Sequence, residues 1–126
     1  MTRVVIDASA LAAFVFQEPG GEVIRQRLEG ATVFAPHLLH YELASVAGKK
    51  IRRHPADGVK ILRALALALD PGTNLVWEDV PAADAILLAQ AAGVSTYDAS
   101  YLWLAGSLGA DLVTLDARLA KAAGTF

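Results

Sequence analysis

The chain has 126 residues, enough for one domain with a buried core and too few for two. Hydrophobic residues make up 55% and mean hydropathy is +0.42, yet charged residues interrupt the apolar runs before the roughly 20 residues that a membrane-spanning helix needs. The absence of cysteine excludes disulfides, thiolate zinc sites and a cysteine nucleophile, so we expect a cytoplasmic protein. From the length and the hydropathy we expect a single domain over residues 1–126 with no membrane segment.

The first expected element is a buried strand that ends in an acidic residue. Three β-branched residues, 4–6, precede Asp7, and the helix-favouring segment 8–13 follows. Near the other end of the chain, residues 112–115 repeat this layout before Asp116. Ligands of open parallel sheets bind beyond the carboxyl ends of the strands, so we expect these two carboxylates to converge.

The remaining elements alternate between helix and strand, which predicts an α/β fold with a central parallel sheet. Segment 59–69 is ambiguous, because part of it alternates with the period of a strand, but its alanines and leucines favour a helix. We expect helices at 22–28, 38–53, 59–69, 82–92 and 99–108, and strands at 31–35 and 75–77.

Four carboxylates are candidates for one site. Asp7, Asp98 and Asp116 are placed at the strand edge, although each on its own could simply cap a helix. Glu42 lies within the expected helix 38–53, beside its apolar stripe, where a carboxylate needs a partner unless it reaches water. Together the four predict a shared acidic pocket.

Clustered carboxylates repel one another, so such a pocket is stable only with protons or a cation among them. Mg²⁺ and Mn²⁺ prefer carboxylate oxygens and need neither histidine nor thiol. Such an ion activates water against phosphodiesters, which predicts nuclease or phosphatase chemistry. The net charge of −2 is compatible with a polyanionic substrate, because the remainder of the chain becomes weakly basic once the four candidate ligands are set aside.

Several short motifs resemble, in order and spacing, those of the PIN-domain ribonucleases, and the chain length is similar to that of the stand-alone toxins of VapBC-type toxin–antitoxin pairs. The motifs are Val5-Ile6-Asp7-Ala8-Ser9, Tyr41-Glu42, Thr96-Tyr97-Asp98-Ala99-Ser100-Tyr101 and Leu115-Asp116.

This resemblance implies a three-layer α/β/α fold with a parallel sheet of four to five short strands. The chain stops soon after its last helix, which leaves the fifth strand open. The resemblance also implies an endoribonuclease dependent on Mg²⁺ or Mn²⁺ that acts as a toxin, forms a homodimer and is inhibited by a small antitoxin. The alternative is a PIN-like binding or scaffold subunit without activity. The implied catalytic and metal-binding residues are Asp7, Glu42, Asp98 and Asp116, with Ser9 and Thr96 as supporting residues.

Three further features have two interpretations each. The cations Lys49, Lys50, Arg52 and Arg53 could bind RNA phosphates or simply complement a helix dipole. Tyr97 and Tyr101 could stack on bases or belong to the core, and we leave both out of the site. The apolar segments 59–69 and 102–104 could form a dimer face, an antitoxin groove or plain core.

Overall fold

The computed structural model describes residues 2–125. Its sheet has four parallel strands in the order β3-β2-β1-β4. This confirms the predicted α/β class, with four strands within the described range and no fifth. The strands are β1 (Thr2–Ile6), β2 (Ala31–Pro36), β3 (Leu75–Glu78) and β4 (Asp111–Val113), and the helices are α1 (Ala8–Val15), α2 (Gly21–Leu28), α3 (Leu39–Arg53), α4 (Gly58–Ala68), α5 (Ala82–Ala92), α6 (Thr96–Leu108) and α7 (Ala117–Thr125).

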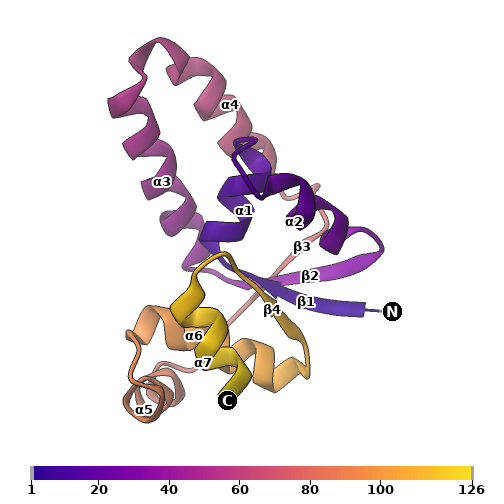
Figure 1. The fold of residues 1–126 in the computed structure, drawn as a ribbon, viewed down its shortest axis with the longest axis vertical. Helices are drawn as coiled ribbons and strands as arrows, with labels where there is room; N and C mark the ends of the chain where they lie inside the picture. Colours follow the sequence, from indigo (N-terminus) through magenta and orange to yellow (C-terminus); the bar gives the residue numbers. More distant parts are fainter. Residues whose placement is uncertain (1, 126) are drawn as a thin grey trace.

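Helices cover both faces of the sheet. Helices α1 and α2 lie on one side, and α5, α6 and α7 lie on the other, so the architecture has three layers (Figure 1). Helix α6 contacts β1, β2 and β4, which makes it the central helix of its layer. The buried core includes Val5 and Ile6 of β1 and Val113 of β4, all fully inaccessible to solvent. Burial on both faces explains the continuous apolar runs of these strands.

Helices α3 and α4 form an antiparallel hairpin that extends beyond the sheet (Figure 1). A 3₁₀ turn, Pro55–Asp57, joins them. Segment 59–69 is therefore helical, as predicted, and three of its large apolar side chains are exposed to solvent: Val59, Leu62 and Leu67. Within residues 2–125, no helix is both long and apolar enough to cross a membrane.

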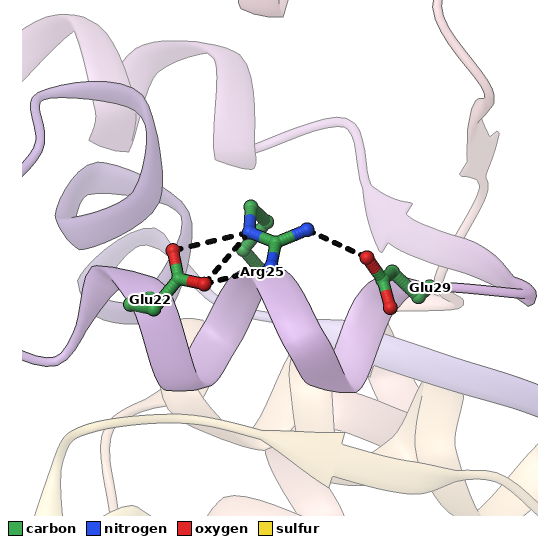
Figure 2. A network of polar contacts seen from close by, with 3 residues as sticks. All are labelled: Glu22, Arg25 and Glu29. Carbon is green, nitrogen blue, oxygen red and sulfur yellow. Dashed lines mark hydrogen bonds and ion pairs between the residues drawn. The ribbon is translucent and has the colours of Figure 1, made fainter.

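Helix α2 carries a polar network on its surface. Figure 2 shows Arg25 between Glu22, three residues before it, and Glu29, four residues after it. The Arg25 guanidinium lowers the pKa of Glu22. All three groups are exposed, so solvent and salt screen the pairs, and they contribute little to stability.

Two predicted boundaries are wrong. Helix α6 begins at Thr96 rather than at 99, because the Ser95 hydroxyl accepts a hydrogen bond from the Asp98 amide and caps the helix earlier. Strand β4 ends at Val113 rather than at 115, because Thr114 and Leu115 turn away from the ladder to bond with residues at the start of α1.

Candidate active site

Asp7 is the most constrained of the four predicted site residues. Its side chain is 5% exposed and follows β1 directly. Oδ1 accepts hydrogen bonds from the Ser9 hydroxyl (2.7 Å) and the Ala10 amide (3.0 Å), and Oδ2 accepts one from the Thr114 hydroxyl (2.5 Å). Asp7 therefore caps α1, and both of its oxygens have fixed directions.

Asp116 lies on the neighbouring loop and is tied to Asp7 through Thr114. The Asp116 amide donates to Thr114 Oγ1 at 3.0 Å, and Asp116 Oδ1 accepts from the amides of Arg118 and Leu119 at the start of α7. Asp116 is therefore also a cap, but its second oxygen, Oδ2, accepts no hydrogen bond within residues 2–125. The capping interpretation and the site interpretation are thus compatible, because they use different oxygens.

Asp98 reaches the same region from a helix. We predicted a strand edge for it, which is wrong: among the described residues, no strand lies between α5 and α6, and Asp98 sits in the first turn of α6. Burial raises the pKa of Asp98, the charges of Asp116 and Asp7 raise it further, and Arg118 partly offsets them. Asp98 is therefore electrostatically coupled to both loop carboxylates.

Glu42 comes from α3 and has the partner that its position demands. The Tyr101 hydroxyl, from α6, donates a hydrogen bond of 2.5 Å to Glu42 Oε1. Burial raises the pKa of Glu42, and the charges of Asp98 and Asp7 add to the effect, while the hydrogen bond from Tyr101 opposes it. Burial and the Glu42 carboxylate raise the pKa of Tyr101, so its phenol remains a donor.

The four carboxylates come from the β1–α1 junction, α3, α6 and the β4–α7 loop. Each is linked to at least one other by charge, but within residues 2–125 no three acidic or histidine side chains are gathered closely enough to form a ligand shell as they stand. The donor set consists of carboxylate oxygens, some of them free, and burial together with neighbouring negative charge raises the pKa values of Glu42 and Asp98. This chemistry fits a hard divalent cation such as Mg²⁺ or Mn²⁺.

The structure adds two residues that our sequence interpretation missed. Tyr101 was left out of the site because a buried tyrosine is usually core, and Thr114 was not considered. In the Asp7-Ala8-Ser9 motif, the Ser9 hydroxyl donates a hydrogen bond to Asp7, and Ser9 Oγ also accepts one from the Leu115 amide at 2.9 Å. The role of Ser9 in the site stays a prediction. Thr96 is exposed, and its backbone carbonyl accepts a hydrogen bond from the Ser100 hydroxyl. A supporting role for its side chain stays a prediction.

The predicted cationic cluster lies far from the carboxylates. At a rise of about 1.5 Å per residue, Arg53 is roughly 17 Å along α3 from Glu42. Lys49, Arg52 and Arg53 are exposed at this end of the hairpin. Lys50 differs, because its ammonium pairs with Glu18 at 2.8 Å and lies over the Phe16 ring. It joins the hairpin to the α1–α2 loop.

Comparison with known proteins places this arrangement in a family. The PIN domain model matches residues 4–125. This chain belongs to the PIN-domain family. Ribonuclease VapC3 of Pyrobaculum aerophilum is 32% identical to it, over 94% of this chain and 93% of the relative. Ribonuclease VapC9 of Mycobacterium tuberculosis is 34% identical, over 92% and 87%. The predicted resemblance to PIN-domain ribonucleases of the VapC type is therefore confirmed.

Solved structures agree with the fold. The crystal structure of PAE2754 from Pyrobaculum aerophilum superposes with a TM-score of 0.76 at 30% identity, covering 96% of this chain and 86% of that one. VapC20 of Mycobacterium tuberculosis, described as a sarcin-ricin loop cleaving toxin, gives 0.68 at 16% identity, with 94% of both chains covered. The second likeness supports the fold alone.

That residues 1–126 form a single domain stays a prediction.

Proposed function

We propose that this VapC-like protein is an endoribonuclease and toxin that depends on Mg²⁺ or Mn²⁺. The observation that carries the proposal is the electrostatic linkage of four carboxylates from separate parts of the chain: Asp98 feels the charges of Asp7 and Asp116, and Glu42 feels those of Asp7 and Asp98. The ribonuclease names of the similar proteins supply the substrate class. As an RNA-cleaving toxin, the protein would act in the cytoplasm.

In this proposal the four carboxylates hold the cation. When bound, the ion supplies a water of lowered pKa and neutralises charge on the phosphodiester. Asp7 offers oxygens that Ser9, Ala10 and Thr114 fix in direction. Asp116 offers Oδ2, since its Oδ1 caps α7. Asp98 and Glu42, whose pKa values are raised, lose their protons more readily when positive charge is close.

The test is cleavage of total RNA with Mg²⁺, with Mn²⁺ and with chelator. Wild type should cleave only with metal, and Asp98→Asn should abolish the cuts while folding normally. Asp84→Asn is the matched control, because Asp84 occupies the first turn of α5 as Asp98 does in α6, but it is exposed and is not among the charges that raise the pKa values of Glu42 and Asp98. Equal cleavage by the Asp98 variant would reject this site. If wild type and the Asp98→Asn variant both fold but neither cleaves RNA, the alternative of a binding subunit would be favoured.

We further propose that the exposed cations Lys49, Arg52 and Arg53 bind RNA phosphates. Within residues 2–125 none of the three forms a salt bridge like that of Lys50, and all three lie toward the C-terminal end of the helix that carries Glu42. RNA reaching from this end of the hairpin to the carboxylates would span several nucleotides.

An apolar groove supports the proposed antitoxin partner. It has a volume of about 580 Å³ and lies between α1, α2, α4 and the start of β3, with Phe14 and Leu67 among its exposed side chains. An amphipathic helix fits such a surface. Leu67→Glu should leave RNA cleavage intact but abolish neutralisation by the proposed antitoxin; unchanged neutralisation would reject the groove. The proposed homodimer is tested separately by sedimentation of the pure protein.

A further inference from the structure

Tyr101 connects the core of the protein to one carboxylate of the proposed metal site. Its ring is 1% exposed, and it ranks among the largest fully buried side chains. Its hydroxyl donates to Glu42 Oε1 at 2.5 Å, across 59 residues of sequence. This length is typical of a strong hydrogen bond from a hydroxyl to an ionised carboxylate.

The position of this hydroxyl is set by packing. Tyr101 belongs to the same core cluster as Val5 of β1 and Leu39 of α3, and α6 contacts three of the four strands. Close-packed interiors hold side chains in single rotamers. The Tyr101 oxygen is therefore a fixed point on the rigid side of the site.

Glu42, by contrast, is a long side chain at the margin of its helix. A free glutamate samples many rotamers and loses that freedom when it binds a metal ion. Here Oε1 is already occupied by Tyr101, whereas Oε2 accepts no hydrogen bond from residues 2–125. One oxygen is thus anchored and the other remains available.

We propose that Tyr101 is a positioning residue, which fixes Glu42 through Oε1 and so presents Oε2 to a divalent cation shared with Asp7 and Asp98. The inference rests on the proposed function, because it assumes that Glu42 is a ligand. Residues that orient metal ligands typically contribute 10–100-fold to metal affinity. Tyr101 does not touch substrate in this role and acts only through Glu42.

The experiment measures Mn²⁺ binding by isothermal titration calorimetry for wild type, Tyr101→Phe and Glu42→Gln. Tyr101→Phe keeps the ring and removes the donor, and it should raise the Mn²⁺ dissociation constant about 10–100-fold. At saturating Mn²⁺, kcat for RNA cleavage should recover to nearly the wild-type value. Combining Tyr101→Phe with Glu42→Gln should weaken binding no further than Glu42→Gln alone.

Tyr41→Phe is the matched control, because Tyr41 is 83% exposed and its hydroxyl has no bond to a described residue. It should bind Mn²⁺ as wild type does. If Tyr101→Phe does not fold, 4-aminophenylalanine and 4-methylphenylalanine at position 101 replace it: both fill the space of the hydroxyl, but only the first donates a hydrogen bond. The amino variant should retain affinity and the methyl variant should lose it.

The outcomes separate the two proposals. If wild type binds Mn²⁺ and Glu42→Gln weakens it, but Tyr101→Phe matches wild type, the positioning role is rejected and the metal site stands. A lower thermal stability with unchanged Mn²⁺ affinity would likewise reduce Tyr101 to a structural residue. If wild type binds no Mn²⁺, or Glu42→Gln binds it equally well, the assignment of Glu42 fails and this inference fails with it.

Discussion

The hydroxyl of Thr114 donates a hydrogen bond of 2.5 Å to Oδ2 of Asp7. The same hydroxyl oxygen accepts the amide of Asp116 at 3.0 Å, so one side chain joins two of the candidate ligands. Thr114 lies just beyond β4 and Asp7 just beyond β1, which are neighbouring strands. This contact fixes the β4–α7 loop against the start of α1.

Thr114→Val should damage both the site and the fold. It keeps the shape of the side chain but leaves Asp7 Oδ2 and the Asp116 amide without their partner, at a cost of about 1–3 kcal/mol in the free energy of unfolding. RNA cleavage should fall about 10–100-fold. Urea unfolding and initial cleavage rates measure the two effects. Thr114→Ser, which keeps the hydroxyl, is the control; a valine variant as active as the serine variant would contradict this role.

Asp98→Asn should stabilise the protein in chelator at pH 7. The raised pKa of Asp98 means that the folded state binds its proton more tightly than the unfolded state. Stability is therefore lost as pH rises from the ordinary aspartate pKa, about 3.9, through the raised value, and the asparagine variant avoids this loss. The advantage should shrink near pH 4. Saturating Mg²⁺ should reverse the order, because only wild type gains binding energy.

Urea unfolding at the two pH values tests this prediction. Asparagine also gives up a favourable interaction between a charge and the helix N-terminus, and Asp84→Asn in α5 measures that loss separately. The contrary result would be that Asp98→Asn, in chelator at pH 7, loses more stability relative to wild type than Asp84→Asn does. Repulsion within the acidic site would then not be a significant cost.

Gly21→Ala should destabilise the packing of α1 on α2. A Cβ at Gly21 would collide with the backbone carbonyl of Ala13, so the two helices would have to separate. Overpacking of this kind costs about 1–3 kcal/mol. Gly106→Ala in α6 has open space and should be neutral or stabilising by up to about 1 kcal/mol. Thermal and urea unfolding compare them, and equal stabilities would disprove the close approach.

Neutralising Arg52 and Arg53 to glutamine should flatten the salt dependence of RNA binding. If both contact phosphates of single-stranded RNA, the slope of log affinity against log salt should decrease by about 1.4. Arg3→Gln with Arg27→Gln removes the same charge far from the hairpin and should leave the slope near the wild-type value. Filter binding of the catalytically inactive protein at several salt concentrations gives both slopes. Identical slopes would remove the hairpin from the RNA path.

The sequence by itself determined the fold class, the resemblance and the four candidate carboxylates. Strand β1 and helix α3 can be predicted without knowledge of tertiary contacts, because the apolar run Val4–Ile6 and the apolar periodicity of α3 are properties of the local sequence. Element boundaries were less certain where a side chain competes with the ladder or the cap. The Ser95 hydroxyl caps α6, which begins three residues before its predicted start. Strand β4 ends before Thr114, whose hydroxyl bonds to Asp7.

Only the tertiary structure decided which residues support the carboxylates. The sequence favours a core position for Tyr101, and its ring is indeed buried. Its hydroxyl, however, bonds to Glu42, which is 59 residues away in the chain. Leu102 and Leu104, considered for an interface, are buried, whereas Leu62 and Leu67 are exposed. Periodicity defines the faces of a helix but not what packs against each face. Long-range contacts settle that question because burial and hydrogen bonding depend on neighbours that are distant in the chain.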